Sequence, residues 1–268
     1  MRASTGRGRH GAWAGAGAVM ESILALREVW LSFPRGRRHV VRVLADVTLD
    51  LQAGEVVAVI AQRAQGKTSL LRVAAGMQRP DRGSVLFAGE EVWQMSDRQR
   101  SRLLRGQIGL VERTAPNLDV PVLTGIALPL LDVHGRRGAY ARAKQALADI
   151  GASECARQHW GELADWEQAL VALAHGIARE PRMLLIDDLT ATLDMDETEE
   201  IVGLLGTLAQ ERGVAVLICA GDSGLASCSD RVASLGGGQL LVTPPSTPAP
   251  TDANVIDFPG ERPRRASF

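Results

Sequence analysis

The sequence predicts an α/β fold in which a parallel β-sheet is covered by helices on both faces. Three short apolar runs, residues 54–60, 182–188 and 214–220, have the length and composition of buried strands. Helical patterns separate these runs, and apolar strands that alternate with helices indicate a parallel sheet. The first run leads directly into Gly-Lys-Thr at positions 66–68, which places a candidate phosphate-binding loop at the end of a central strand.

The segment before the first run is predicted to form an antiparallel β subdomain. Residues 23–33 and 43–51 alternate apolar and polar side chains, as half-buried strands do, and the basic stretch 34–39 joins them as a turn. Residues 83–93 have the pattern of a further strand and hairpin.

Helical periodicity is found in residues 66–77, 97–104, 140–150, 166–180 and 195–213. The first helix is expected to end near Gly76, with Pro80 beyond it as a stop, and Pro181 closes the fourth. Acidic residues fill the first turn of the last helix, where the helix dipole favours negative charge.

Composition excludes several classes of function. The chain of 268 residues is 46% hydrophobic and 23% charged, as in an ordinary globular protein. Its 30 basic and 31 acidic residues nearly cancel, so no overall charge attracts nucleic acid or anionic lipid. Cys155, Cys219 and Cys228 form no C-x-x-C pair, which argues against structural zinc and a disulfide framework and favours a reduced, cytosolic protein.

The two ends of the chain are predicted to be disordered, and residues 22–242 to be the folded part. Residues 1–21 faintly imitate a secretory signal, but their Gly/Ala-rich stretch lacks the Leu, Ile and Phe of such signals. Met20 is an alternative start, since the periodic pattern begins directly after it. Residues 243–268 begin as a Pro/Ser/Thr tail with too little apolar content to fold. No apolar run reaches the roughly 18 residues of a membrane span.

The loop after the first strand matches the pattern G-x-x-x-x-G-K-S/T except that Ala61 replaces the first glycine. In such loops backbone N–H groups and the helix N-terminus bind phosphate, the lysine, here Lys67, reaches the β and γ phosphates, and the hydroxyl, here of Thr68, joins the Mg²⁺ shell. The predicted nucleotide-binding residues are Ala61, Gln62, Arg63, Ala64, Gln65, Gly66, Lys67, Thr68 and Ser69. Alanine at positions 61 and 64, where glycine is common, is expected to cost about 1 kcal/mol each. The alternative is a strand–turn–helix with an incidental Gly-Lys-Thr.

Two acids end the second apolar run. Asp187, on a strand expected beside the loop strand, is a candidate Mg²⁺ ligand, and Asp188 is a candidate catalytic residue that orients water. The alternative is that both simply cap a strand at the surface. Because loop and acids occur in the expected order, the functional interpretation is favoured.

Here the sequence resembles a known family. Residues 182–194, RMLLIDDLTATLD, are similar to the Walker B motif and D-loop of ABC transporter ATPases, which read L-L-L-L-D-E-P-T-x-x-L-D. The similarity extends over residues 24–241, and Phe33 stands where the family places an aromatic that stacks on adenine. The resemblance continues through residues 70–93, the Q-loop region 108–130 and the signature region 161–187. Among subfamilies, lipoprotein-release and macrolide-export ATPases are the most similar.

The resemblance implies a P-loop NTPase (RecA-like) core, with a mixed or parallel sheet and a helical signature subdomain at about residues 96–178. It implies that the chain binds ATP and Mg²⁺ and dimerises head to tail, as a homodimer or with a more intact paralogue. It also implies separate ABC permease membrane subunits as partners, with residues 113–135 receiving a permease coupling helix. No nucleic acid partner is expected. Such a subunit would be cytoplasmic and peripheral at the inner face of the cell membrane.

The chain departs from the family at the signature, which reads Leu163-Ala164-Asp165-Trp166-Glu167 instead of L-S-G-G-E. Asp165 would repel a polyphosphate, and Trp166 puts a large ring where backbone must come close. The structural alternative is that Asp165 caps a helix and Trp166 packs beneath it.

Three further roles are altered. Arg113 aligns with the Q-loop glutamine, Asp188 with the general-base glutamate, and Gly221 with the switch histidine. A displacement of about 1 Å in a positioned group costs on the order of 100-fold in rate, so slow or absent hydrolysis is expected. A non-catalytic nucleotide-binding regulator or scaffold is therefore the alternative function. A kinase or GTPase is disfavoured, because no N-K-x-D motif is present and the D-loop-like TATLD argues against a small-molecule kinase.

Overall fold

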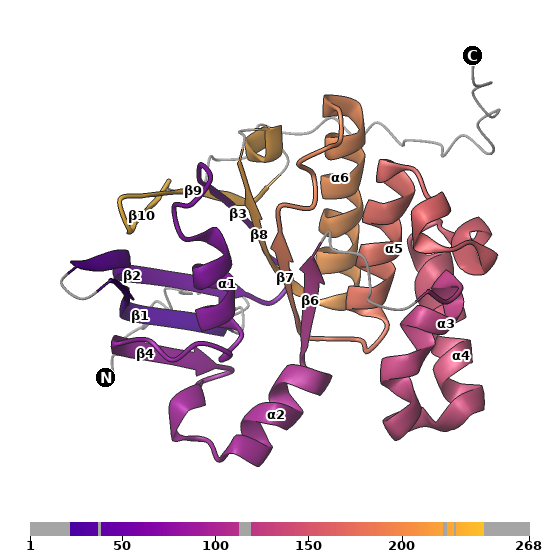
Figure 1. The fold of residues 1–268 in the computed structure, drawn as a ribbon, viewed down its shortest axis with the longest axis horizontal. Coiled ribbons are helices and arrows are strands. Elements are labelled where there is room, and N and C mark those ends of the chain that lie inside the picture. Colours follow the sequence, from indigo (N-terminus) through magenta and orange to yellow (C-terminus); the bar gives the residue numbers. More distant parts are fainter. Residues whose placement is uncertain (1–21, 37–38, 113–118, 222–223, 228, 244–268) are drawn as a thin grey trace, which may run out of the picture.

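The structure is a computed structural model that describes residues 22–36, 39–112, 119–221, 224–227 and 229–243 (Figure 1). The predictions about residues 1–21, Met20, Arg113 and the tail from residue 244 on concern positions outside the described residues. In the part that is described, no helix combines the length and apolarity of a membrane span.

The predicted antiparallel β subdomain is confirmed as a sheet with the order β2-β1-β4-β5. Its strands are β1 (Ser22–Arg35), β2 (His39–Gln52), β4 (Arg82–Phe87) and β5 (Glu90–Glu91). β1 and β2 pair along nearly their whole length, with register shifts where Glu28 and Asp46 adopt positive φ. The long hairpin brings Phe33 and Val41 together at its far end.

The second sheet has the order β10-β9-β3-β8-β7-β6, and every neighbouring pair except β10–β9 is parallel. Its strands are β3 (Val56–Ile60), β6 (Ile108–Glu112), β7 (Met183–Asp187), β8 (Ala215–Ala220), β9 (Arg231–Gly236) and β10 (Gln239–Val242). The three predicted apolar strands form its centre. One expectation was wrong: β8 lies between β3 and β7, so the strand of Asp187 is not the neighbour of the loop strand.

Helices cover the parallel sheet on both faces (Figure 1). They are α1 (Lys67–Ala74), α2 (Asp97–Gly106), α3 (Val122–Ala127), α4 (Leu131–Asp149), α5 (Asp165–Ile177) and α6 (Met195–Arg212). α1 lies between the two sheets, whereas α5 and α6 stand on the opposite face of the parallel sheet with α3 and α4 outside them (Figure 1). α4 begins before the predicted residue 140 and is interrupted by Gly135 at φ 62°.

Two hydrophobic cores result from this layering. Because side chains alternate along a strand, Val57 and Val59 of β3 face the core shared with α1 and the antiparallel sheet. Val56 and Ala58 face the core shared with α5 and α6. Both faces are buried, which explains why the central strands have continuous apolar runs.

Two glycines set how closely α5 approaches β6. A Cβ added to Gly109 of β6 would come within 2.5 Å of the Gly176 carbonyl oxygen, and one added to Gly176 within 2.4 Å of Val111 Cγ2. Neither position can accept a side chain without moving the helix away from the strand. The Gly109–Gly176 contact therefore fixes α5 against the edge of the sheet.

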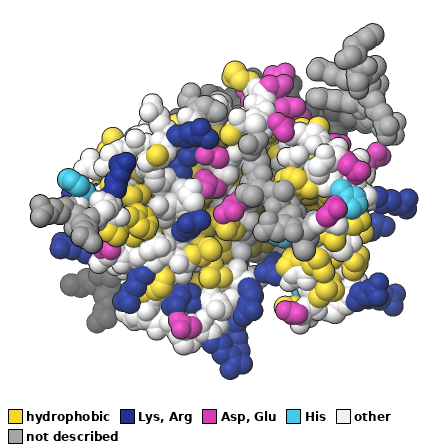
Figure 2. Space-filling view, viewed as in Figure 1, with side chains coloured by type: hydrophobic (Ala, Val, Ile, Leu, Met, Phe, Trp, Pro, Cys, Tyr) yellow, Lys and Arg dark blue, Asp and Glu magenta, His cyan; other side chains and the backbone are white. Residues whose placement is uncertain are grey.

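The surface carries both signs of charge. On the face shown in Figure 2, Lys and Arg side chains alternate with Asp and Glu, and basic side chains gather at the lower edge, where α2 lies. α2 contributes the exposed Arg98, Arg102 and Arg105. No broad basic face is visible in this view, in keeping with the balanced composition.

Candidate nucleotide-binding site

The loop between β3 and α1 ends in a glycine that no other residue could replace without strain. Gly66 caps α1 with φ 101° and ψ 11°, a left-handed conformation. A Cβ at this position would come within 2.8 Å of Val43 Cγ1 and 3.0 Å of the Val43 carbonyl oxygen on β2. Both backbone and space therefore require glycine where α1 begins and its N–H groups face outward.

The two alanines of the loop differ in the backbone strain that they carry. Ala64 has φ 62°, so it carries the strain predicted for an alanine in a glycine position. Ala61 is not among the residues with positive φ; it is buried and continues the line of β3, with its N–H donating to the Ala220 carbonyl at 2.9 Å. The expectation of strain at both positions was therefore wrong for Ala61.

Lys67 is the first residue of α1, and its side chain is only 7% exposed. Its ammonium group donates to the Ala61 carbonyl at 3.0 Å and lies 2.8 Å from Asp188 Oδ1. The lysine therefore closes the loop on itself and joins it to the end of β7.

Thr68 and Asp187 meet although β8 separates their strands. The Thr68 hydroxyl donates to Asp187 Oδ2 at 2.6 Å, because α1 crosses the strand ends and carries Thr68 to the end of β7. The other oxygen, Asp187 Oδ1, is buried and has no hydrogen-bond partner among the residues that the structure describes. A hydroxyl beside an unpaired carboxylate oxygen suits a hard divalent cation, which prefers oxygen ligands. The residues present thus fit Mg²⁺, whose remaining ligands would be phosphate and water.

Asp188 and Gly221 flank the lysine on its other side. Asp188 has φ 47°, and its N–H donates to the Cys219 carbonyl at 2.9 Å. A Cβ added to Gly221 would lie 3.6 Å from Lys67 Nζ, so a side chain at position 221 would point at the ammonium group. Burial, followed by the negative charge of Asp187, raises the pKa of the Cys219 thiol well above its usual range.

The remaining predicted residues lie around this centre. Phe33 is 40% exposed and pairs with Val41, two positions from the Val43 that contacts Gly66. The strand pairing therefore places Phe33 near the turn of the β1–β2 hairpin. Gln62 and Arg63 are exposed and Ser69 is half-buried.

Gln65 makes a contact that sequence reasoning missed. Its Oε1 accepts a hydrogen bond of 3.1 Å from the Gly237 N–H in the β9–β10 turn. The Gly238 carbonyl in the same turn accepts from the Ala45 N–H of β2 at 2.7 Å. The loop's own backbone bond, Gln65 N–H to the Gln62 carbonyl, is long at 3.4 Å, so the turn supplies part of the support that the loop lacks.

We therefore expect Gln65→Met, which keeps the side-chain length but removes the acceptor, to weaken nucleotide binding about fivefold, the equivalent of roughly 1 kcal/mol for one hydrogen bond. Isothermal titration gives the affinity, and hydrogen exchange should show lost protection of the Gly237 amide. Gln210→Met is the matched control, since the Gln210 side chain is exposed on α6, outside the loop. Equal affinities for both variants would contradict a supporting role for Gln65.

The altered signature lies at the start of α5. The N-cap is Ala164, and not Asp165 as the structural alternative predicted, because the Glu167 carboxylate accepts from the Ala164 N–H at 2.9 Å. Asp165 is exposed in the first turn, and the half-buried Trp166 packs against the core beneath α5. Among the described residues, no hydrogen bond or ion pair joins Asp165 to the phosphate loop of the same chain.

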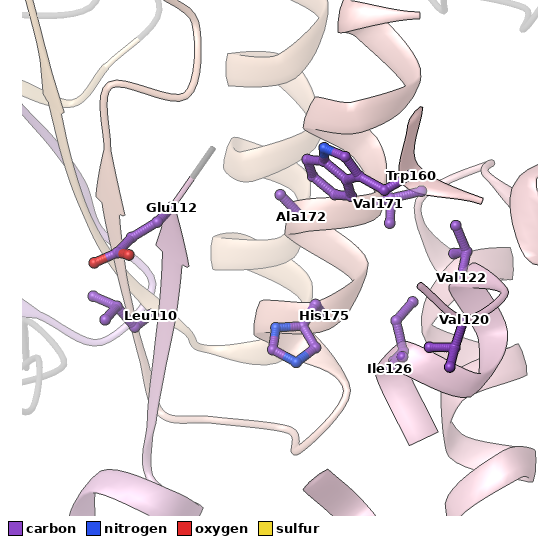
Figure 3. Close-up of a pocket in the computed structure, with 10 residues that line it drawn as sticks. Leu110, Glu112, Val120, Val122, Ile126, Trp160, Val171, Ala172 and His175 are labelled. Carbon is purple, nitrogen blue, oxygen red and sulfur yellow. The ribbon is translucent and has the colours of Figure 1, made fainter. Parts of the chain in front are cut away.

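A cavity of about 330 Å³ lies between β6, α3 and α5 (Figure 3). Val122, Ile126 and Trp160 contribute to its apolar wall, while Glu112 and His175 supply polar groups. The His175 side chain is exposed to the cavity, but nearby protein atoms remove much of the water around its ring. This desolvation, followed by the positive charge of the nearby Arg179 guanidinium, lowers the pKa of His175. Sequence reasoning singled out residues 113–135, which contribute Val122 and Ile126, but neither Trp160 nor His175.

Comparison with known proteins identifies the family. A protein-family model described as ABC transporter matches residues 44–191. The lipoprotein-releasing system ATP-binding protein LolD of Cereibacter sphaeroides is 33% identical over 224 residues, covering 83% of this chain and 100% of that protein. LolD of Chromohalobacter salexigens is 35% identical over 203 residues, covering 75% of this chain and 85% of that protein.

Solved structures agree with this fold. A dimeric bacterial ABC transporter cassette aligns with a TM-score of 0.72 at 24% identity, covering 81% of this chain and 96% of that chain. A post-hydrolysis dimer of the same cassette, bound to ADP and Pi, also aligns with a TM-score of 0.72. With its family model matched over residues 44–191 and relatives above 30% identity, the chain belongs to the ABC transporter family as one of its ATP-binding domains.

Proposed function

We propose that this chain binds MgATP at the β3–α1 loop and couples closure of an ATPase dimer to a separate membrane permease, with weak hydrolysis. The observation that carries the proposal is the hydrogen bond of 2.6 Å from Thr68 to Asp187, whose other carboxylate oxygen is buried without a partner in the described part of the chain. An incidental Gly-Lys-Thr would have no reason to place a hydroxyl against an acid 119 residues further along the chain.

In this proposal different residues of the chain bind different parts of the nucleotide. Backbone N–H groups at Gly66 and the start of α1 bind the phosphates, helped by the positive end of the helix. Lys67 turns from Asp188 to the β and γ phosphates, Thr68 and Asp187 hold Mg²⁺, and Phe33 stacks on adenine. The cation, when bound, would neutralise phosphate charge.

Weak hydrolysis is expected because the groups that face the γ-phosphate in intact relatives are altered in this chain. Asp188 carries its carboxylate one methylene short of a glutamate, and Gly221 offers no side chain beside the lysine. Across the dimer, the exposed Asp165 would bring negative charge toward the partner's nucleotide. Because phosphoryl transfer depends on positioning and charge stabilisation, each change slows the reaction.

For the permease contact, the cavity between β6, α3 and α5 offers an apolar groove of suitable chemistry. Val122 and Ile126, within the segment predicted to receive a coupling helix, form part of its wall. The LolD relatives are named as ATP-binding proteins of a lipoprotein-releasing system, which supports a system of several subunits as the setting. We place the chain in the cytoplasm, at the inner face of the cell membrane, where it would contact the permease.

A regulatory or scaffold protein that binds ATP without consuming it is the second candidate. It is favoured by the Lys67–Asp188 ion pair of 2.8 Å, because the carboxylate expected to orient water is engaged by the lysine. Such a protein would use nucleotide only to shift the population of its closed dimer.

Two measurements on purified protein, MgATP binding and phosphate release, decide between these functions, with the Cereibacter sphaeroides LolD measured in parallel as the reference. We expect binding together with release far slower than that of the reference. Binding with no release, in the presence as well as the absence of a co-purifying permease, would favour the regulator. No binding at millimolar ATP would contradict both candidates.

A further inference from the structure

The carboxylate of Asp188 binds the Lys67 ammonium group that a nucleotide phosphate would need. The ammonium group has two partners in the described structure, the Ala61 carbonyl at 3.0 Å and Asp188 Oδ1 at 2.8 Å. The lysine side chain is 7% exposed and that of Asp188 40%. A buried ammonium requires an anion nearby, and here the protein itself supplies it.

We propose that Asp188 determines nucleotide affinity as an internal competitor: its carboxylate holds Lys67 in the empty site and must be displaced when a polyphosphate binds. This inference rests on the proposed function, since it concerns the same loop. It goes beyond the expected role of Asp188 in orienting water, because competition acts on binding whether or not ATP is hydrolysed.

The backbone limits how far Asp188 can retreat. Its N–H is held by the Cys219 carbonyl at 2.9 Å, and its φ of 47° places it in a sparsely populated conformation. The pair can therefore separate only when the short Asp188 side chain or the Lys67 side chain rotates. A phosphate that reached Lys67 would approach this carboxylate, and two negative charges at such distances repel.

The neighbouring positions 221 and 187 do not reduce this competition. At Gly221, where an added Cβ would lie 3.6 Å from Nζ, there is no side chain to hold either the ammonium group or an incoming phosphate. Asp187 is already engaged by Thr68 at 2.6 Å. Phosphate and Asp188 thus compete for one ammonium group.

A purely structural ion pair gives the opposite expectation. If the pair served only to stabilise the fold, neutralising Asp188 would lower the melting temperature and leave nucleotide affinity unchanged or reduced. Competition predicts tighter binding. The sign of the change in affinity, together with its dependence on Lys67, therefore separates the two interpretations.

The test is Asp188→Asn, measured by isothermal titration with MgADP and with a non-hydrolysable ATP analogue, so that hydrolysis does not contribute. Asparagine has nearly the same shape and tolerates the left-handed backbone. We expect affinity to rise about fivefold, which allows for the partial exposure of the pair. Glu211→Gln on α6, which removes the same unit of charge at an exposed position, should leave affinity unchanged.

Lys67→Ala completes a double-mutant cycle. Adding Asp188→Asn to Lys67→Ala should gain less affinity than adding it to the wild type, since the ion pair is already absent. If Lys67→Ala binds as the wild type does, the proposed function itself fails. If Lys67→Ala loses binding but Asp188→Asn does not tighten it, only this inference is overturned. Should Asp188→Asn not fold, Asp188→Ser is measured in the same way, and unchanged or weaker binding overturns the inference.

Discussion

Replacing Lys67 with alanine is expected to weaken MgATP binding by about 10- to 100-fold while the protein stays folded. Hydrogen bonds to charged groups contribute roughly 1.5–3 kcal/mol each, and every 1.4 kcal/mol is about tenfold in affinity. The side chain is buried, and in the proposed function its ammonium group turns from Asp188 to the phosphates. Asp188, left without its partner, is 40% exposed and can be solvated, so the loss of stability should be small.

The chain offers a matched control for this experiment. Its only other lysine is Lys144, which is exposed on α4. Lys144→Ala removes the same charge and should leave both affinity and melting temperature unchanged. Fluorescence titration with a labelled ATP analogue and a thermal melt would be run on both variants. Equal binding by Lys67→Ala and the wild type would show that the loop does not hold the phosphates.

Sequence reasoning found the parts of this fold that depend on local pattern. The three central strands are continuous apolar runs because both of their faces are buried, and that composition is visible in the sequence. β6, β9 and β10 were not predicted as strands, since they lie toward the edges of the sheet and mix polar or glycine residues with apolar ones. The phosphate loop was found from its motif, but the order of strands was not, because nothing local states that β8 separates β3 from β7.

Contacts between distant segments could not have been predicted. The Gln65–Gly237 hydrogen bond joins residues 172 positions apart and depends on how the β9–β10 turn meets β2. The Lys67–Asp188 ion pair depends on the conformation of Asp188, and its φ of 47° leaves no mark in the sequence. Ala164 caps α5 instead of the better N-cap residue Asp165, because Glu167 reaches back to its N–H. In each case tertiary geometry, and not residue preference, decides the outcome.

Restoring four family residues together is expected to raise phosphate release by at least about tenfold, since each restored group repositions or supplements the contacts on the γ-phosphate. The substitutions are Asp165→Gly, Trp166→Gly, Asp188→Glu and Gly221→His. Effects of groups that act together are not additive, so the combination, and not the sum of single variants, is the informative measurement. Phosphate release at saturating MgATP is the readout.

The structure indicates which of these changes the fold accepts. A side chain at Gly221 has room, because an added Cβ meets Lys67 Nζ at an ordinary 3.6 Å. At Asp188, glutamate retains the charge and extends the carboxylate by one methylene. The signature substitutions cost more: Trp166 packs against the core beneath α5, and each glycine in a helical turn costs up to about 1 kcal/mol. A lower melting temperature is therefore expected for the fourfold variant.

This cost makes a second variant necessary. Asp188→Glu with Gly221→His leaves α5 unchanged and restores the two groups nearest Lys67. Instability of α5 therefore cannot mask a gain in phosphate release by this variant. Lys67→Ala in either background should remove the gain, because the phosphates would no longer be held. If both variants are folded, bind MgATP and release phosphate no faster than the wild type, then positions 165, 166, 188 and 221 do not hold the roles assigned to them. Weak hydrolysis would then require another cause, since the groups that align the γ-phosphate would have been returned without effect.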